Sequence, residues 1–316
     1  MTTPGPLRRD GERVYALPSF RILLHIDRAL GDPSMKDAAG KLLALFLEGL
    51  DHTDMIFGHA GGRIKKLGAE YINDKVIAKA VKWAAETEWQ WPSTLRFARW
   101  FDDFDCSGPP HIRLEQRAYL ATIQIELPPD DPRCVIFAER VQQIVADLPV
   151  IWGVMGYGMF QPVALDSLIF LLPRVATRYR CAIEVQPDRV ESALRREASF
   201  EQLRLGETPV LSVPDIGWRT LVGREFLERL PDLAELAGVE GLSVVASERF
   251  TSITAGPQPI WGDVNEAEDI SLYSSVADAL RPVRADWPYA SKAFFGGAID
   301  NSGLDRLEAW YGRFDA

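Results

Sequence analysis

The segment RAYLATIQIEL, residues 117–127, constrains the fold more than any other stretch because its side chains alternate in character. One parity is apolar or aromatic: Tyr119, Ala121, Ile123, Ile125 and Leu127. The other parity holds Thr122, Gln124 and Glu126. A period of two places alternate side chains on opposite faces of a β-strand. The sequence therefore predicts a strand here, with one apolar face.

The rest of the chain mixes the strand period with the helical period. Strand patterns cover 20–26, 95–97, 150–160 and a hairpin over 242–256, with a tight turn near Glu248. Helical spacing covers 35–50, 73–86, 132–148, 163–179, 188–197, 218–230, 272–280 and 304–311. Asp32 and Asp131 each precede a proline and are predicted helix N-caps.

These elements favour an α+β fold of mostly antiparallel sheet segments with helices packed on them. No linker is long or polar enough to mark a domain boundary, so we expect a single large domain over residues 1–316, with a division into two subdomains left open. Its core should span about 18–284, and 285–316 should form a C-terminal extension with a helix.

The composition is that of a globular cytoplasmic protein. The N-terminal segment has no apolar run of the kind a secretory signal needs, and the most apolar windows are too short to cross a bilayer. The chain has three widely spaced cysteines, which favour reduced thiols over a disulfide framework. We expect neither a membrane nor a nucleic acid as a direct partner.

The negative charge is concentrated in the C-terminal part of the chain. Residues 1–180 carry 22 basic and 22 acidic side chains, whereas residues 181–316 carry 13 basic and 23 acidic ones. Phosphate contacts need a basic surface, so this part is unsuited to nucleic acid. An acidic face attracts a basic protein partner, although acidic residues also serve solubility alone.

Motifs for common catalytic and cofactor sites are missing. The four histidines form no HExxH motif, and CxxC and GxSxG do not occur. HAGGRIKKLG, residues 59–68, lacks the P-loop pattern, and GVMGYG, residues 153–158, lacks the GxGxxG order and is predicted to be a close-packed strand. We therefore predict no catalytic residue, no metal and no cofactor.

One acid cluster leaves a catalytic alternative open. Asp102, Asp103 and Asp105 follow a tryptophan-rich stretch, and three neighbouring carboxylates could hold Mg²⁺ for hydrolysis or phosphoryl transfer. Such clusters more often form solvated loops. A metal-dependent hydrolase or phosphotransferase is thus one alternative, and a non-catalytic scaffold protein is another.

The stretch ITAGPQPIWGDVNEAEDISLYSSVADALRPVR, residues 253–284, brings together a Gly-Asp-Val-Asn turn, four acids and a short amphipathic helix. It does not fit a calcium-binding EF-hand loop, because the sixth position is Glu268 instead of Gly and the twelfth is Ser274 instead of Glu. Gly262 is expected to allow the turn, and Asp263 or Asn265 to accept hydrogen bonds from nearby backbone amides.

This stretch resembles the C-terminal signature of the type VI secretion immunity protein family, with its "AGPxP–GDVN" turn and "ALxPxR" helix end. The tryptophan-led segment GWRTLVGREFLERLPD, residues 217–232, is also similar to that family. The match departs at Val222, at Pro231-Asp232 and at Glu266, where a basic residue is expected.

The resemblance implies an antidote that binds and neutralises an antibacterial effector protein, with no chemistry of its own. Occlusion of a basic active-site cleft, such as that of a nuclease, would suit the acidic C-terminal part. The side chains assigned to partner binding are the following: Glu266, Glu268, Asp269, Asp286, Trp287, Tyr289, Asp102, Asp103 and Asp105. The three acids after the turn are assigned on the premise that they lack a structural role.

Overall fold

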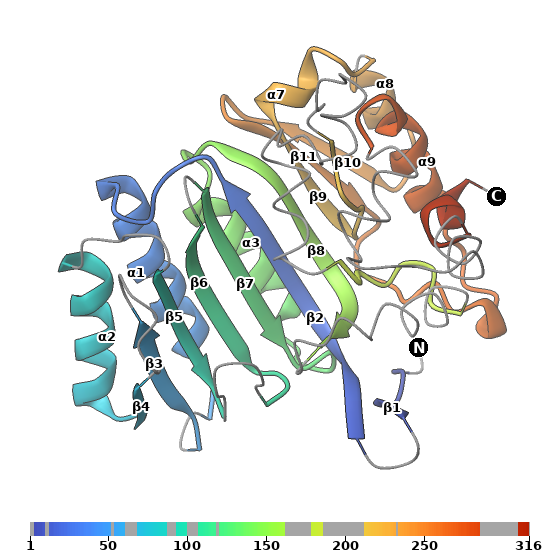
Figure 1. Cartoon of the computed structure of the whole chain (residues 1–316). Coiled ribbons are helices and arrows are strands. Elements are labelled where there is room, and N and C mark those ends of the chain that lie inside the picture. The colour runs from blue at the N-terminus through green and yellow to red at the C-terminus, as the bar shows by residue number, and fades with distance from the viewer. Residues whose placement is uncertain are drawn as a thin grey trace, which may run out of the picture.

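The computed structural model describes residues 3–9, 13–51, 54–60, 68–86, 93–99, 107–117, 120–161, 178–185, 212–231, 233–284 and 309–315. Within these ranges, eleven strands form one sheet in which every pairing between neighbouring strands is antiparallel (Figure 1). The order is β10-β11-β9-β8-β2-β7-β6-β5-β3-β4, and β1 pairs with β2 outside this path.

The N-terminal strands are β1 (Leu7–Arg9), β2 (Arg13–Ile26), β3 (Ile56–Ala60), β4 (Gly68–Tyr71), β5 (Ser93–Ala98), β6 (His111–Arg117) and β7 (Leu120–Leu127). They are followed by β8 (Val150–Phe160), β9 (Arg219–Gly223), β10 (Leu242–Ala246) and β11 (Phe250–Ala255). The predicted strands at 20–26, 95–97, 117–127 and 150–160 and the predicted hairpin are confirmed.

The longer helices are α1 (Pro33–Leu47), α2 (Asp74–Glu86), α3 (Cys134–Ile144) and α9 (Ser271–Ala279), and the short ones are α7 (Arg224–Leu227) and α8 (Ala234–Ala237). The Asp32 side chain caps α1 by accepting a hydrogen bond from the Ser34 amide at 2.9 Å, as predicted. The cap predicted at Asp131 is wrong: α3 begins at Cys134, and Asp131 instead accepts from the amide and Nε of Arg133.

The apolar surface of the sheet changes face along the strand order. One cross-strand row runs Phe97, Ile112, Ile125, Ile22, Met155, Arg219, Thr254, Ser243, from apolar to polar. The adjacent row, on the other face, runs Arg96, Arg113, Gln124, Leu23, Val154, Thr220, Ile253, Val244, from polar to apolar. Side chains of adjacent rows point to opposite faces, so the change occurs between β2 and β9.

Helices follow this change of face. On the face that carries Ile125, which we call the α1/α3 face, α1 and α3 lie behind the central strands in the view of Figure 1. Gln142 of α3 accepts a hydrogen bond there from Ser252. On the α9 face, which carries Arg21, the guanidinium donates to the Ile183 carbonyl at 2.9 Å, and α9 joins the same core. Each helix thus covers the face whose strands are apolar beneath it.

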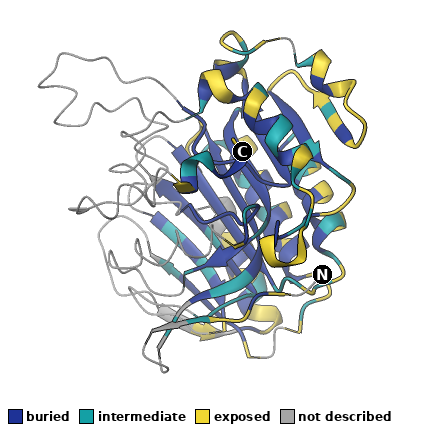
Figure 2. Cartoon of the chain, turned by 90° about the vertical axis from the view of Figure 1, so that its right-hand side faces the viewer, coloured by how far each residue is buried: buried dark blue, intermediate teal, exposed yellow. Residues whose placement is uncertain are grey.

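One hydrophobic core links the described elements, from Phe20 in β2 to Phe314 near the C-terminus. Trp310 and Phe314 are both buried in it, so the described end of the expected extension 285–316 packs into the main core. Figure 2 shows that buried residues concentrate in the strands of the sheet and that the short outer helices are mostly exposed. The predicted α+β single domain is confirmed. In the described ranges, no helix has the length and apolar character needed to cross a membrane.

The helix predicted over 218–230 is wrong. Residues 219–223 form strand β9, and only Arg224–Leu227 are helical, as α7. Trp218, Leu221 and Val222 have helical spacing, but all five residues of β9 are buried. A strand buried on both faces shows no alternation, so its apolar residues mimic the helical period.

Three further predicted helices lie wholly or mainly outside the described residues. These are 188–197, 163–179 and 304–311. The end of the second is described and is not helical: Arg178 lies in a turn and Tyr179 forms an isolated bridge with Asp263. The end of the third is helical over 309–311 and continues into the 3₁₀ turn Gly312–Phe314.

Candidate functional site

The segment 262–271, which we call the acidic corner, connects the hairpin β10–β11 to α9 and carries three of the acids assigned to partner binding. Gly262 opens it with a φ of +66°, a left-handed conformation that favours glycine. A Cβ at this position would lie 2.8 Å from Cys181 Sγ and 2.9 Å from the Cys181 amide nitrogen. The predicted role of Gly262 in the turn is confirmed on both grounds.

Asp263 holds the corner together. Its Oδ1 accepts from the Asn265 amide at 3.0 Å, which is the predicted turn, and the two carboxylate oxygens also accept from Arg178 Nε and Nη2 at 3.1 and 3.0 Å. These hydrogen bonds hold the pKa of Asp263 below its ordinary value, with Arg178 the largest cause. The prediction that GDVN forms a structural corner is therefore confirmed.

Glu268 and Asp269 also have structural partners, so the premise behind their assignment is wrong. Glu268 Oε2 accepts from the Asp263 amide at 3.0 Å. Asp269 Oδ1 accepts from the Ser271 amide at 2.8 Å, at the start of α9, and this bond lowers the pKa of Asp269. Both carboxylates bind the backbone of their own corner. Their contact with a partner stays a prediction.

Glu266 lies at the exposed tip of the corner, together with Val264, Asn265 and Ala267. Val264 leaves 51 % of its surface exposed, and Ala267 has a φ of +50°, which is uncommon for a residue with a Cβ. The tip therefore presents one carboxylate and one apolar side chain on a backbone whose turn is fixed by Gly262 and Asp263.

Aromatic side chains hold the corner against the sheet. The Trp261 ring stacks on Tyr157 of β8, with centroids 4.8 Å apart, and meets the edge of Tyr179 at 5.8 Å. The Arg178 guanidinium lies 4.8 Å from the centre of the Tyr179 ring. Offset-stacked and edge-to-face pairs of this kind fix ring orientation. The exposed tip is thus mounted on a rigid base.

The C-terminal residues are anchored beside α9 by arginines. Arg313 is buried and donates to Asp215 Oδ1 at 2.5 Å, and Arg284 donates to Asp315 Oδ1 at 2.9 Å. The sequence-based assignment missed Arg178 and Arg313, because their carboxylate partners lie 85 and 98 residues away along the chain. No local pattern marks such a pair.

The N-terminal part of the α9 face carries a buried polar network. In the sequence, its only sign is the alternation of polar and apolar residues over 117–127. Arg21 Nε donates to Glu126 Oε1 at 3.1 Å, while Ser19 and Gln124 each donate to Glu126 at 2.8 Å. Burial raises the pKa of Glu126, and the charge of Arg21 opposes this change. His111 is also buried, and burial holds its pKa well below the ordinary value. Because Glu126 accepts from three donors, this network is built to hold strands together.

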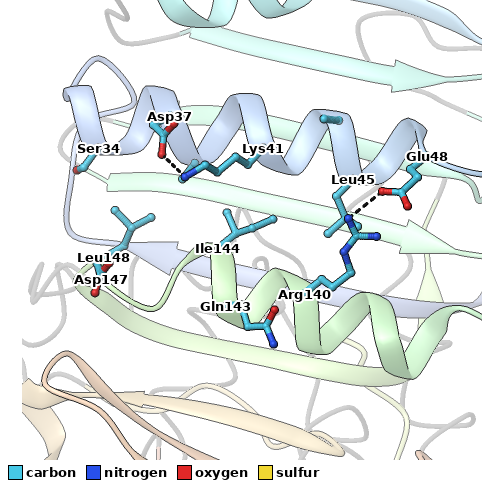
Figure 3. A pocket seen from close by; sticks show the side chains of 12 residues that line it. Ser34, Asp37, Lys41, Leu45, Glu48, Arg140, Gln143, Ile144, Asp147 and Leu148 are labelled. Carbon is cyan, nitrogen blue, oxygen red and sulfur yellow. Dashed lines mark ion pairs between the residues drawn. The ribbon is translucent and has the colours of Figure 1, made fainter.

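A groove of about 550 Å³ lies between α1 and α3 (Figure 3). Glu48, the C-cap residue of α1, and Arg140 of α3 form an ion pair of 2.8 Å across it, and Asp37 pairs with Lys41 at 2.6 Å along α1. These side chains are mostly exposed, so each pair adds little stability. The hydroxyl of Ser34, which lines the groove, donates to Asp32 Oδ1 at 2.6 Å, within the cap of α1. The groove is a surface hollow between two helices.

Six assigned residues lie outside the described ranges. These are Asp102, Asp103, Asp105, Asp286, Trp287 and Tyr289. Their contact with a partner stays a prediction, and so does the alternative of a metal-dependent hydrolase built on the three aspartates. Among the residues that the structure does describe, no group of three or more His, Cys, Asp or Glu side chains is arranged to hold a metal ion.

Comparison with known proteins identifies a related fold. No family model matches the chain, and no curated protein matches it. Among solved structures, the chain is similar to Pseudomonas aeruginosa T6SS protein PA0821, where T6SS denotes the type VI secretion system. The two share 14 % sequence identity with a TM-score of 0.69, over 96 % of this chain and 83 % of the other. At this identity, the match shows that the two proteins have the same fold.

Proposed function

We propose that this protein is an immunity protein that binds and neutralises an antibacterial effector of a type VI secretion system. The observation that carries the proposal is the shared fold with a type VI secretion protein, which extends over 96 % of this chain. The resemblance of residues 217–284 to the immunity protein family supports the same reading.

The mechanism we propose is occlusion of the effector's active site without chemistry by this chain. The chain's whole excess of ten negative charges lies in residues 181–316, which carry 23 acidic and 13 basic side chains. Such a surface suits a basic cleft, because opposite potentials speed association and add affinity. A nuclease has a cleft of this kind, since it must hold phosphates. We propose the cytoplasm as the place where the two proteins meet.

Co-expression tests the proposal. The product of the neighbouring reading frame is induced in a susceptible bacterium, alone and together with this protein, and survival is counted. We expect the effector to be toxic alone and harmless when this protein is present. The two purified proteins should then form a stable complex, measured by calorimetric titration. Toxicity that this chain fails to relieve would eliminate the proposal.

A charge reversal at the corner tip tests the electrostatic part. Glu266→Lys should slow association with the effector, because it adds positive charge to a surface that faces a basic cleft. Asp54→Lys is the matched control: Asp54 is also exposed but lies in the charge-balanced part of the chain. Equal association rates for the two variants, measured at low ionic strength, would show that the corner does not face the partner.

A further inference from the structure

We propose that strand β10 binds an extended, basic segment of the effector along its free edge and thereby adds a strand to the sheet. This inference rests on the proposed function and names the docking surface. β10 is the last strand of the sheet order, and in the described ranges β11 is the one strand that pairs with it. Added-strand binding takes its affinity from backbone hydrogen bonds and its specificity from alternate side chains.

The hydrogen-bond register shows which backbone groups face outward. The Ser247 amide donates to Phe250, and the Gly256 amide donates to Gly241, at the two ends of the β10–β11 pair. Hydrogen-bonded and non-hydrogen-bonded positions alternate in an antiparallel pair. Residues with odd numbers in β10 therefore bond to β11, and Val244 and Ala246 direct their N–H and C=O groups to the open edge.

The side chains within β10 are not of the kinds that usually prevent strand addition. Natural edge strands are often protected by charged side chains, proline or short length. The positions of β10 that do not bond to β11 are Leu242, Val244 and Ala246, and none of them is charged or a proline. The Leu242 amide already donates to the Val239 carbonyl at 3.0 Å, so the open N–H groups are those of Val244 and Ala246. At the opposite end of the sheet, β4 has four residues, and its Glu70 is engaged in an ion pair with Lys79. The edge strand β4 thus carries a charged side chain, whereas the edge strand β10 carries none.

An apolar groove of about 500 Å³ lies beside the open edge. The strands contribute Val244, Ala246 and Thr251 to its lining, and the segment from α7 to α8 contributes Leu227, Leu230 and Leu233. In an added strand, the residues opposite Val244 and Ala246 project to the same face as these two side chains. Alternate apolar side chains of an incoming strand would therefore enter this groove while its backbone pairs with β10.

Charge selects a basic partner over a second copy of this chain. Residues 224–249 hold six acids and three bases, and the exposed Glu240 and Glu248 flank β10 at its two ends. Two copies of this chain could pair their β10 strands antiparallel, with Val244 opposite Val244, which is the register that pairs the most outward backbone groups. In this register, Glu240 of one copy would lie opposite Glu248 of the other. Like charges directly opposite destabilise a strand pair, whereas flanking lysine or arginine residues of an effector would pair with these acids.

Hydrogen exchange at single amides tests the geometry of the edge in the free protein. We expect the amides of Val244 and Ala246 to exchange quickly and those of Ser243 and Val245 slowly, because only the second pair bonds to β11. Slow exchange at Val244 and Ala246 in the free chain would show that the edge is already occupied, and would overturn the inference whatever the function.

The complex with the effector tests the docking itself. Exchange at Val244 and Ala246 should slow by about tenfold or more on binding, and Val244→Lys should weaken binding by about tenfold or more. Val245→Lys is the matched control, because it adds the same charge one residue away on the opposite face, where Val245 is 54 % exposed. Ala246→Pro removes an outward N–H at an exposed position and should weaken binding too. Thermal unfolding checks that each variant is folded.

The outcomes separate this inference from the proposed function. If the wild-type chain neither binds nor neutralises the effector, the proposed function is wrong. If it does both, but Val244→Lys and Ala246→Pro bind as tightly as Val245→Lys and the edge amides stay unprotected, the function stands and the edge-docking inference is overturned.

Discussion

The two halves of the sheet carry their apolar side chains mainly on opposite faces. The first half consists of β5, β6, β7 and β2, and the second consists of β9, β11 and β10. In β5, β6, β7 and β2, the apolar side chains lie on the α1/α3 face, and the α9 face holds Arg21, Glu126 and His111. In β9, β11 and β10, the α9 face holds Val222, Ile253 and Val244 together with the two threonines Thr220 and Thr251. The α1/α3 face there is mixed, since Arg219, Ser252 and Thr254 stand beside the buried Leu221 and Phe250. One continuous sheet thus provides packing surfaces on both of its faces, at different places along the strand order.

Glycines in β8 make the change of face possible. A Cβ at Gly153 would lie 2.5 Å from Leu24 Cδ2, on the α1/α3 face, and one at Gly158 would lie 2.3 Å from the Ile183 carbonyl oxygen, on the α9 face. Both neighbours would have to move. The glycine-rich strand thus admits close packing from both sides at the point where the core changes face.

The largest expected effect comes from breaking the polar network of the first half. Arg21→Met leaves Glu126 buried without its ionic partner, and we expect a loss of about 3–5 kcal/mol in the free energy of unfolding. Denaturant unfolding followed by circular dichroism measures it. The double variant Arg21→Met/Glu126→Leu should recover much of this loss, because it removes both charges from the interior.

A double variant as unstable as Arg21→Met would show that the ion pair is needed for more than charge compensation. The Arg21 guanidinium also donates to the backbone carbonyls of Ile183 and Val185. Failure of the double variant would therefore place the main role of Arg21 in holding segment 178–185 on the sheet.

A somewhat smaller effect is expected from a cavity on the apolar face of the same half. Ile125 is completely buried and faces α1 and α3. Ile125→Ala should cost about 2–5 kcal/mol, from lost burial and the cavity left behind. The same unfolding measurement applies. A cost well under about 1 kcal/mol would mean that this face is loosely packed, and the comparison between the two halves would lose its basis.

The acidic corner, which is attached to the second half, gives a smaller effect that depends on pH. Asp263→Asn keeps an acceptor for the Asn265 amide but loses the charge that binds Arg178, so it should cost about 1 kcal/mol at pH 7. The pKa of Asp263 is lowered in the folded protein. The advantage of the wild type is therefore complete above the unfolded pKa, near 3.8, and disappears as pH falls through the lower folded pKa.

Stability measured from pH 7 downward checks this sign. Because Asn does not titrate, the two unfolding free energies should converge at acid pH. A difference that stays constant with pH would mean that the charge of Asp263 does not contribute and that the amide geometry alone explains the cost.

The sequence predicted those elements whose signal is local. The alternation at 117–127 gave a strand, Asp32-Pro33 gave the start of α1, and Gly262 with Asp263 gave the corner, because a few neighbouring residues determine each of these features. The hairpin turn near Glu248 was also local: Ser247 Oγ accepts from the amides of Arg249 and Phe250 and closes the loop.

Features that depend on distant partners escaped prediction. Strand β9 was assigned to a helix because burial on both faces hides its alternation. The bonds of Glu268 and Asp269 are local instead, to backbone amides five and two residues away, and the assignment to a partner overlooked them. The change of face across the sheet requires the strand order, which places β2 between β7 and β8.

The smallest effect on stability is expected in the second half of the sheet, where polar side chains lie on the α1/α3 face. A substitution there tests the change of face directly. Ser252 lies on the same face as Ile125 but in the second half, and its hydroxyl donates to Gln142 at 3.1 Å. Ser252→Ala should cost about 0.5–1 kcal/mol, the worth of one neutral hydrogen bond, as measured by denaturant unfolding. Ser252→Val, which adds apolar bulk, should be tolerated if this side of the sheet is open between α3 and β10, where a groove of about 330 Å³ includes Ser252 and Val245. A loss as large as that of Ile125→Ala would mean that both halves pack this face equally tightly.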